Sequence, residues 1–316
     1  MGIGTMIMST CIGTAPASPV HRAGAARLAC ALIAGLALAA PTQARTATPR
    51  PPADPPVEKI RPSKIILVGD STIQPQSGWG SSFCGYRIVS TAACLNLARG
   101  GRSTKSYRAE GSWDVALGEM KTPGYVDIWV LIQFGHNDQP GKPGRSTDLA
   151  TEFPANLRRY VAETRAAGAK PILVTPLTRR QFRDGSLIRE LDPWNAAIRK
   201  VAAELDVPLV ELNARSAAVI EAMGPAMATH YAQSAPTPDI VAAALTGTTS
   251  ASDPSVPVPP APPLPPLAAG APPYTARVRP LFDYTHLNRD GADLFAGIVA
   301  DELAIKVPAM RPLLVP

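Results

Sequence analysis

Between residues 64 and 212 the chain alternates short apolar segments with longer amphipathic ones, and this alternation is the feature that most limits its fold. The helical patterns include residues 152–167 and 193–205. The apolar segments have the length of buried strands and lie at residues 64–68, 95–98, 128–134, 170–175 and 208–212. Continuous apolar strands that alternate with helices are typical of a parallel sheet covered on both faces. The sequence therefore predicts a doubly wound α/β fold.

Three candidate site residues come soon after predicted strands. Ser71 follows the first strand, Gly101 the second and Asn137 the third. In open parallel sheets the ligand crevice lies at the carboxyl ends of the strands. We therefore expect all three residues at one edge of the sheet.

A carboxylate and an imidazole stand close together near the end of the chain, at Asp283 and His286. Three residues apart, both side chains can point into one cleft from a single turn. A serine is a poor nucleophile unless a base lies within hydrogen-bond reach and a third group orients that base. Ser71, His286 and Asp283 could supply these three roles, provided that folding brings Ser71 to the other two.

Each of these motifs is weak evidence when taken alone. Gly69-Asp70-Ser71 occurs by chance in many proteins and is also a common helix cap. The chain lacks the G-x-S-x-G elbow, which argues against the usual α/β-hydrolase arrangement.

Taken together, four blocks resemble the SGNH superfamily, also called GDSL hydrolases, and most closely its rhamnogalacturonan acetylesterase branch. The resemblance covers residues 64–231 and 281–303. Its blocks are Gly69-Asp70-Ser71-Thr72 with Gly78-Trp79-Gly80, Gly101-Arg102-Ser103 with Ser106-Tyr107, Phe134-Gly135-His136-Asn137-Asp138, and Asp283-x-Thr285-His286-Leu287-Asn288.

This resemblance implies a three-layer α/β/α fold with a flavodoxin-like, five-stranded parallel sheet, and it implies roles for single residues. Ser71 would be the nucleophile, His286 the base and Asp283 the group that orients His286. The backbone amides of Ser71 and Gly101 and the side-chain amide of Asn137 would form the oxyanion hole. No cofactor or metal is expected. His136 is expected to brace or pack, not to catalyse.

The function that follows is a secreted serine esterase that removes O-acetyl groups from a pectin-type polysaccharide through an acyl-enzyme intermediate. Its partner would be the acetylated polysaccharide, and we expect a monomer. One alternative is a GDSL-type lipase or arylesterase that acts on other esters. Another is a non-catalytic glycan-binding module, and a third is a scaffold protein whose proline-rich segment is the working part.

The N-terminal segment indicates secretion. An apolar run at residues 28–40 follows Arg22 and Arg27 and precedes Thr42-Gln43-Ala44, a pattern typical of a signal peptide over residues 1–44. A membrane anchor is the alternative, but the run is shorter than the ~20 residues that a bilayer span needs. Residues 45–62 contain six prolines and are predicted to be a linker. We expect a secreted or periplasmic protein whose mature form is not in the membrane.

Signal removal would leave two cysteines, Cys84 and Cys94. Two cysteines this close in a secreted chain predict one disulfide, and two buried thiols are the alternative.

The charge pattern gives little support to nucleic-acid binding. The net charge of +6 would fall to about +4 in the mature chain, because the signal peptide contains two arginines and no acids. Four cations, Arg99, Arg102, Lys105 and Arg108, lie near the second block. We predict that Arg102 or Lys105 helps to hold uronate carboxylates, whereas the alternative is an ordinary solvated face.

Residues 232–280 interrupt the pattern and contain 13 of the 35 prolines. We expect a surface insertion, largely polyproline or disordered, within a catalytic domain of residues 63–316. A motif for a proline-recognising partner is an alternative function of this segment. The chain should re-enter the domain near Leu281.

Overall fold

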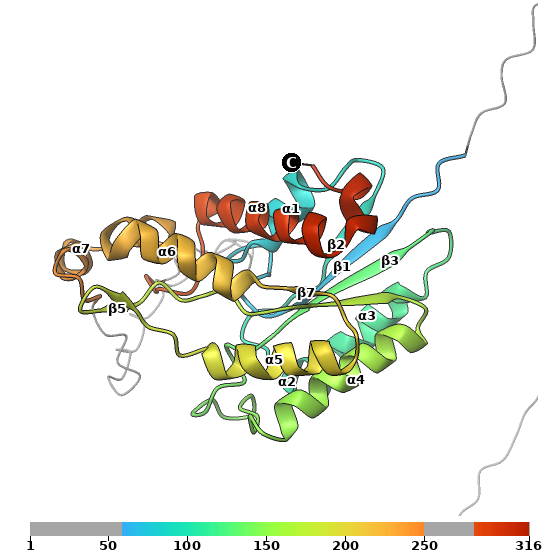
Figure 1. The fold of residues 1–316 in the computed structure, drawn as a ribbon, viewed down its shortest axis with the longest axis horizontal. Coiled ribbons are helices and arrows are strands. Elements are labelled where there is room, and N and C mark those ends of the chain that lie inside the picture. The colour runs from blue at the N-terminus through green and yellow to red at the C-terminus, as the bar shows by residue number, and fades with distance from the viewer. Residues whose placement is uncertain (1–58, 250–280, 316) are drawn as a thin grey trace, which may run out of the picture. The chain divides into compact units, whose positions relative to one another are not determined.

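A five-stranded parallel sheet forms the centre of the computed structural model, which describes residues 59–249 and 281–315 (Figure 1). Its strands lie in the order β2-β1-β3-β4-β7. Numbered along the chain within this sheet, the order is 2-1-3-4-5, the flavodoxin-like arrangement. The bounds are β1 Lys64–Gly69, β2 Ala93–Asn96, β3 Ile128–Gln133, β4 Lys170–Val174 and β7 Leu209–Val210. The five predicted strands are confirmed, with β2 starting and ending two residues early.

Strand β1 is central because it is apolar on both faces. It pairs in parallel with β2 on one side and with β3 on the other. Side chains alternate along a strand, so Ile65 and Leu67 pack into one hydrophobic core while Ile66 and Val68 pack into the other. All four are fully buried.

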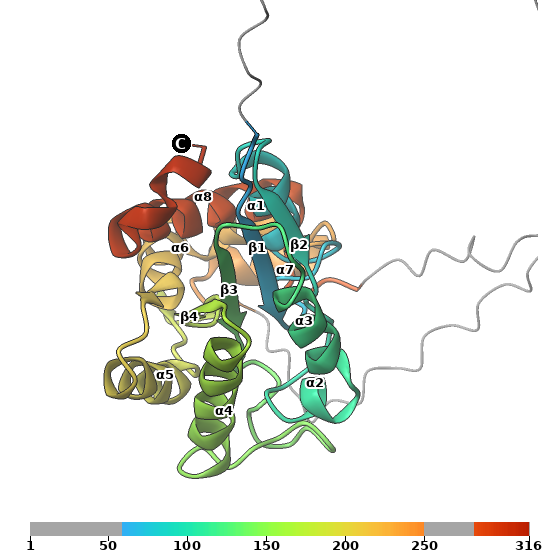
Figure 2. The same cartoon turned by 90° about the vertical axis from the view of Figure 1, so that its right-hand side faces the viewer.

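Helices cover both faces of the sheet, which makes three layers (Figure 2). One face packs against α1 (Gly80–Tyr86), α6 (Leu212–Ala228) and α8 (Arg289–Lys306), which contribute Phe83, Ile220, Phe295 and Val299 to one core. The other face packs against α3 (Ser112–Met120), α4 (Glu152–Ala166) and α5 (Asp192–Glu204), through Trp113, Leu157 and Ile198. The short α2 (Ser106–Ala109) precedes α3. The predicted three-layer fold is confirmed.

Residues 232–280 are predicted to be a surface insertion that is largely polyproline or disordered, but the beginning of this segment is helical. Residues 238–245 form helix α7 (Pro238–Leu245). Pro238 starts this helix, where its missing N–H costs no hydrogen bond, and an alanine-rich segment continues it. The following residues pair with the hairpin of β5 (Phe182–Arg183) and β6 (Ser186–Leu187): the Thr249 amide donates to the Phe182 carbonyl at 3.1 Å. Residues 250–280 lie outside the described residues.

Cys84 and Cys94 form the predicted disulfide, which ties α1 to β2 with Cα atoms 5.3 Å apart. The proposed signal peptide and residues 45–58 of the proposed linker lie outside the described residues. Among the helices that the structure does describe, none is both long and apolar enough to span a bilayer.

Candidate active site

Ser71 lies in a tight turn directly after β1. The turn is held by Asp70, whose Oδ1 accepts hydrogen bonds from the Thr72 amide at 2.9 Å and the Thr72 hydroxyl at 2.7 Å. The Ser77 hydroxyl donates to the Ser71 carbonyl at 2.8 Å. Ser71 itself is 8% exposed. The serine is therefore largely buried, on a backbone that local hydrogen bonds hold in place.

Folding brings the serine to the distant Asp-x-x-His motif. The His286 Nε2 atom is 2.8 Å from the Ser71 Oγ atom, and the His286 Nδ1 atom is 2.6 Å from the Asp283 Oδ2 atom. The other carboxylate oxygen, Oδ1, accepts the backbone amides of Thr285 and His286, each at 2.7 Å. Burial raises the pKa of Asp283, but its hydrogen bonds with His286 and Thr285 outweigh this and lower the pKa to about 2. The carboxylate is therefore ionised and oriented toward the imidazole.

The other two site candidates occupy the same edge of the sheet. Gly101 follows β2 and Asn137 follows β3, and these strands flank β1. Gly101 has a φ of 76°, a conformation that favours glycine because it has no Cβ. The Asn137 Nδ2 atom donates to the Arg102 carbonyl at 3.0 Å. A side-chain amide has two N–H donors, so one of them remains for an oxyanion.

A buried carboxylate joins the two loops that carry these candidates. Asp138 accepts hydrogen bonds from the Thr104 hydroxyl at 2.5 Å and from the Thr147 hydroxyl at 3.1 Å. Burial raises the pKa of Asp138 to about 7, although the hydrogen bonds from Thr104 and Thr147 oppose this shift. Asp138 thus braces the loop after β2 against the loop after β3.

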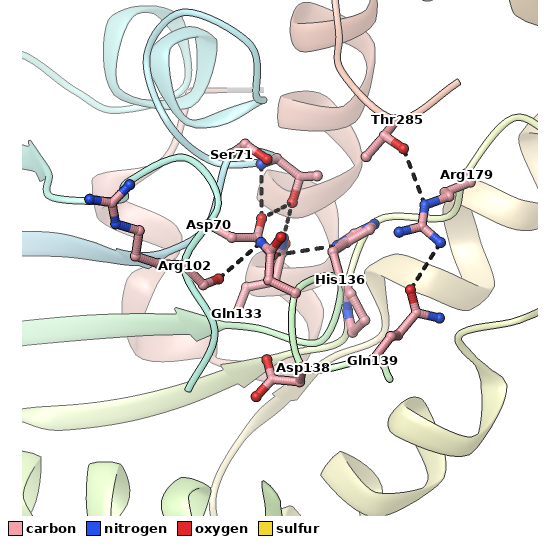
Figure 3. A network of polar contacts seen from close by, with 12 residues as sticks. Asp70, Ser71, Arg102, Gln133, His136, Asp138, Gln139, Arg179 and Thr285 are labelled. Carbon is pink, nitrogen blue, oxygen red and sulfur yellow. Dashed lines mark hydrogen bonds and ion pairs between the residues drawn. The ribbon is translucent and has the colours of Figure 1, made fainter. Parts of the chain in front are cut away.

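His136 is buried behind the serine loop, as expected for a bracing residue. Its Nδ1 atom lies 3.5 Å from the Asp70 Oδ2 atom. Figure 3 shows this pair beside Gln133, whose amide donates to the Thr72 hydroxyl at 2.6 Å. Burial lowers the pKa of His136 despite the opposing effect of Asp70, so the ring is neutral. Nowhere in residues 59–249 and 281–315 do three His, Cys, Asp or Glu side chains gather as a metal site would require.

The two predicted substrate-binding cations already have partners in the protein. Arg102 Nε donates to Glu110 at 2.8 Å, and Lys105 Nζ lies 3.1 Å from Glu152. In Figure 3 the Arg102 carbonyl faces the network around Ser71, while its guanidinium extends away from it. The whole predicted cluster is paired, because Arg99 lies 3.6 Å from Glu110 and Arg108 forms two hydrogen bonds with Glu163. The structure therefore gives neither Arg102 nor Lys105 a free charge for a ligand.

Arg180 is a site residue for which the sequence carried no motif. Its side chain is fully buried, and its guanidinium donates to the carbonyls of His286 at 2.8 Å, Thr285 at 3.3 Å and Asp283 at 3.5 Å. Burial lowers the pKa of Arg180 to about 10, partly offset by Asp283, so it remains charged at neutral pH. One feature of the sequence could have identified Arg180 as a site residue: it comes soon after β4 and so belongs to the same sheet edge.

Further contacts dock the Asp283–His286 loop from other sides. The Leu287 amide donates to the Ser77 carbonyl at 2.9 Å, and the Gln233 amide donates to the His286 carbonyl at 3.0 Å. Arg179 Nε donates to the Thr285 hydroxyl at 3.1 Å, as Figure 3 shows. The triad geometry is therefore assembled in the resting protein, although residues 250–280, before the loop, lie outside the described part of the domain.

We expect the Arg180→Met variant to lose both stability and activity. The methionine keeps an apolar stem but removes the guanidinium donor of three loop carbonyls, of which that of His286 keeps another donor, the Gln233 amide, so Tm should fall by roughly 5–10 °C. Displacement of His286 should lower kcat by about 10²-fold even well below the melting temperature. Calorimetry and p-nitrophenyl acetate hydrolysis measure the two effects. Arg183→Met, at an exposed arginine of β5, is the matched control and should change neither. Equal Tm values for the two variants would contradict the role of Arg180 in holding the Asp283–His286 loop.

The fold and these contacts define a class of protein: a carboxylic ester hydrolase of the SGNH type, with a serine, a histidine and a carboxylate in line at the edge of a 2-1-3-4-5 sheet. The chain belongs to the GDSL-like lipase/acylhydrolase family, whose model matches residues 67–230. The predictions of the superfamily and of an ester hydrolase are confirmed.

Two relatives from Bacillus subtilis (strain 168) define the branch. The chain is 34% identical over 167 residues to the probable rhamnogalacturonan acetylesterase YesY, covering 51% of this chain and 75% of the relative. It is 37% identical over 173 residues to the rhamnogalacturonan acetylesterase RhgT, covering 52% and 71%. The similarity indicates an esterase of the rhamnogalacturonan acetylesterase type.

A solved structure supports the fold. The crystal structure of the Bacillus subtilis protein YxiM superposes with a TM-score of 0.54 at 23% identity, covering 78% of this chain and 57% of that chain. This chain thus spans somewhat more than half the length of that protein.

Proposed function

We propose that this protein is a secreted serine esterase that removes O-acetyl groups from a pectin-type polysaccharide of the rhamnogalacturonan class. The chemistry rests on one observation, the line of contacts from Asp283 through His286 to Ser71. The substrate class rests on the similarity to YesY and RhgT. The Cys84–Cys94 disulfide supports secretion, because disulfides persist mainly in oxidising compartments.

The geometry supports an acyl-enzyme route. His286 Nε2 takes the proton of Ser71 Oγ as the oxygen attacks the acetyl carbonyl carbon. The Ser71 and Gly101 amides and the Asn137 side chain stabilise the oxyanion that forms. His286 then gives the proton to the sugar oxygen, which leaves as a hydroxyl. Water attacks the acetyl-serine by the same steps, releasing acetate and restoring Ser71.

The surroundings of the serine favour a carbohydrate over a lipid. Polar groups adjoin the triad loop: Arg179 donates to the Thr285 hydroxyl at 3.1 Å and to the Gln139 side chain at 3.0 Å (Figure 3). Hydroxyl-rich ligands need such donors and acceptors, whereas a fatty acyl chain needs a buried apolar surface.

The direct test is a panel of acetylated polysaccharides scored for free acetate, with p-nitrophenyl esters of increasing chain length run in parallel. We expect the highest kcat/KM on acetylated rhamnogalacturonan and a decline from acetyl to octanoyl esters. Faster cleavage of the octanoyl ester, without acetate release from any polysaccharide, would instead establish a lipase. Every substrate that the wild-type protein hydrolyses should be left intact by the Ser71→Ala variant.

A further inference from the structure

Arg145 lies beside the two oxyanion candidates and has no carboxylate partner. Its Nη1 atom is 3.4 Å from the Gly101 carbonyl and 3.5 Å from the Asn137 Oδ1 atom. The side chain is half-buried. Among the described residues no Asp or Glu lies within ion-pair distance of it, in contrast to the paired Arg102 and Lys105. Long contacts to neutral oxygens leave most of its donors available to a ligand.

The loop that carries Arg145 is held firmly by its own hydrogen bonds. Ser146 Oγ donates to the Gln139 carbonyl at 2.8 Å and accepts the Lys142 amide at 2.8 Å. Lys142 Nζ donates to the His136 carbonyl at 2.5 Å, and the Thr147 amide donates to the Asp138 carbonyl at 2.9 Å. A cation on a loop fixed at both ends needs little ordering when a ligand binds.

Positive charge accumulates at this loop. Burial lowers the pKa of Lys142 to about 8, and repulsion from Arg179 and Arg145 adds to the shift. The acids that oppose it, Asp70 and Asp138, are both buried and occupied by their own hydrogen bonds. The region therefore attracts an anion from the solvent side.

The same loop borders a depression that extends this surface. The depression has a volume of about 370 Å³ and is lined by Lys105, Gly141, Lys142, Pro143, Gly144 and Ser146. Because Lys105 is paired with Glu152, Lys142 is the cation of this depression that a polymer carboxylate could meet in addition to Arg145.

Building on the proposed function, we infer that Arg145 is a specificity-determining residue that binds the carboxylate of a uronate in the acetylated polymer, next to the oxyanion hole. A guanidinium presents its donors as a planar fork that matches both oxygens of a carboxylate. A neutral acetylated sugar makes no such contact. The enzyme therefore selects acidic over neutral acetylated polysaccharide through one side chain.

The test compares one polymer in two charge states. Acetylated pectin with free carboxylates and the same polymer with methyl-esterified carboxylates differ only in charge. For Arg145→Ala we expect KM to rise about tenfold on the free-acid polymer, the size of one lost charge-assisted hydrogen bond. KM on the methyl ester should rise much less, so the ratio of the two KM values reports the contact with the carboxylate. Arg145→Lys should recover part of the loss. Arg158→Ala removes the same charge from an exposed site paired with Glu204 and is the matched control.

Three outcomes would overturn the inference. One is an unchanged KM for Arg145→Ala on the free-acid polymer. A second is an equal loss on both polymers and on p-nitrophenyl acetate, which would make Arg145 a positioning residue for Asn137. A third is an equal loss in Arg158→Ala, which would mean a diffuse charge effect.

A second measurement separates this inference from the proposed function. Unacetylated oligogalacturonate should inhibit p-nitrophenyl acetate hydrolysis competitively, and Arg145→Ala should weaken this inhibition about tenfold. If wild-type protein releases no acetate from either polymer, the proposed function fails, while the inhibition constant still decides whether Arg145 binds a uronate. Equal inhibition of wild type and Arg145→Ala would contradict the subsite.

Discussion

The Ser71→Ala variant is expected to lose about 10⁶-fold in kcat on p-nitrophenyl acetate and on acetylated polysaccharide, because knocking out a triad nucleophile removes the whole acyl-enzyme route. The substitution removes a single oxygen atom, which lies 2.8 Å from His286 Nε2, so it leaves no sizeable cavity. Tm should therefore change little. Steady-state kinetics with a spectrophotometric ester and thermal unfolding of the same samples measure both quantities.

The matched control for this prediction is Ser81→Ala. Ser81 is an exposed serine in α1, ten residues further along the chain, and its loss should leave kcat within about twofold, as is usual for a surface substitution. A Ser71→Ala protein that retains a tenth of the wild-type rate would show that another nucleophile acts. Organophosphonate labelling followed by mass spectrometry identifies the nucleophile directly, with Ser71 as the expected site.

The second large effect is expected for Asp283→Asn, a loss of about 10⁴-fold in kcat, the size seen when a triad acid is made neutral. The asparagine oxygen can still accept the Thr285 and His286 amides that now bind Oδ1. Its NH₂ group then faces His286 Nδ1, 2.6 Å from the present Oδ2. A donor there favours the imidazole tautomer with its proton on Nε2, and this tautomer cannot accept the serine proton. Kinetics at neutral pH measure the loss.

Asp301→Asn is the control for the removed charge, since Asp301 is an exposed residue of α8. A loss for Asp283→Asn of less than about tenfold would mean that His286 is oriented mainly by Arg180 and the backbone. A large rise in KM with constant kcat would instead place Asp283 in substrate binding.

Acid titration provides a separate check on Asp283. Its pKa in the folded protein is lowered to about 2, below the ordinary value of about 3.9. A carboxylate with a lowered pKa stabilises the fold above the unfolded pKa, and this contribution is lost as pH falls toward the folded pKa. The difference in unfolding free energy between wild type and Asp283→Asn should therefore shrink between about pH 4 and pH 2. A difference that stays constant over that range would contradict the shift.

The predictable part of this fold follows from local patterns. The segments that form β1, β3 and β4 are short apolar runs, and the segments that form α4 and α5 repeat their apolar residues at helical spacing. The spacing of apolar residues reflects which side chains are buried, and this burial determines whether each segment forms a strand or a helix. Helix α7 was missed because the prolines of residues 232–280 dominated the composition, although a proline at the start of a helix is compatible with it.

The site residues that belong to motifs could be predicted from the sequence. Those whose role depends on ion pairs with distant residues could not. Ser71, Gly101 and Asn137 could be placed at one sheet edge from their positions after strands. Arg102 and Lys105 could not be told from free cations, because Glu110 and Glu152 reach them only in the folded chain. Arg145 belongs to no motif, and only its position beside Gly101 and Asn137 in the folded chain marks it as a candidate for substrate binding.

Short-range patterns in the chain specify the alternation of strands and helices, the edge of the sheet that holds the site, and the residue types of a serine esterase. Which of these groups meet depends on contacts between distant parts of the folded chain. His286 reaches Ser71 across 215 positions, and Arg180 holds the loop of His286 by hydrogen bonds to backbone carbonyls. Contacts to backbone carbonyls depend on where the chain passes and not on which residues it contains, so they leave no pattern in the sequence.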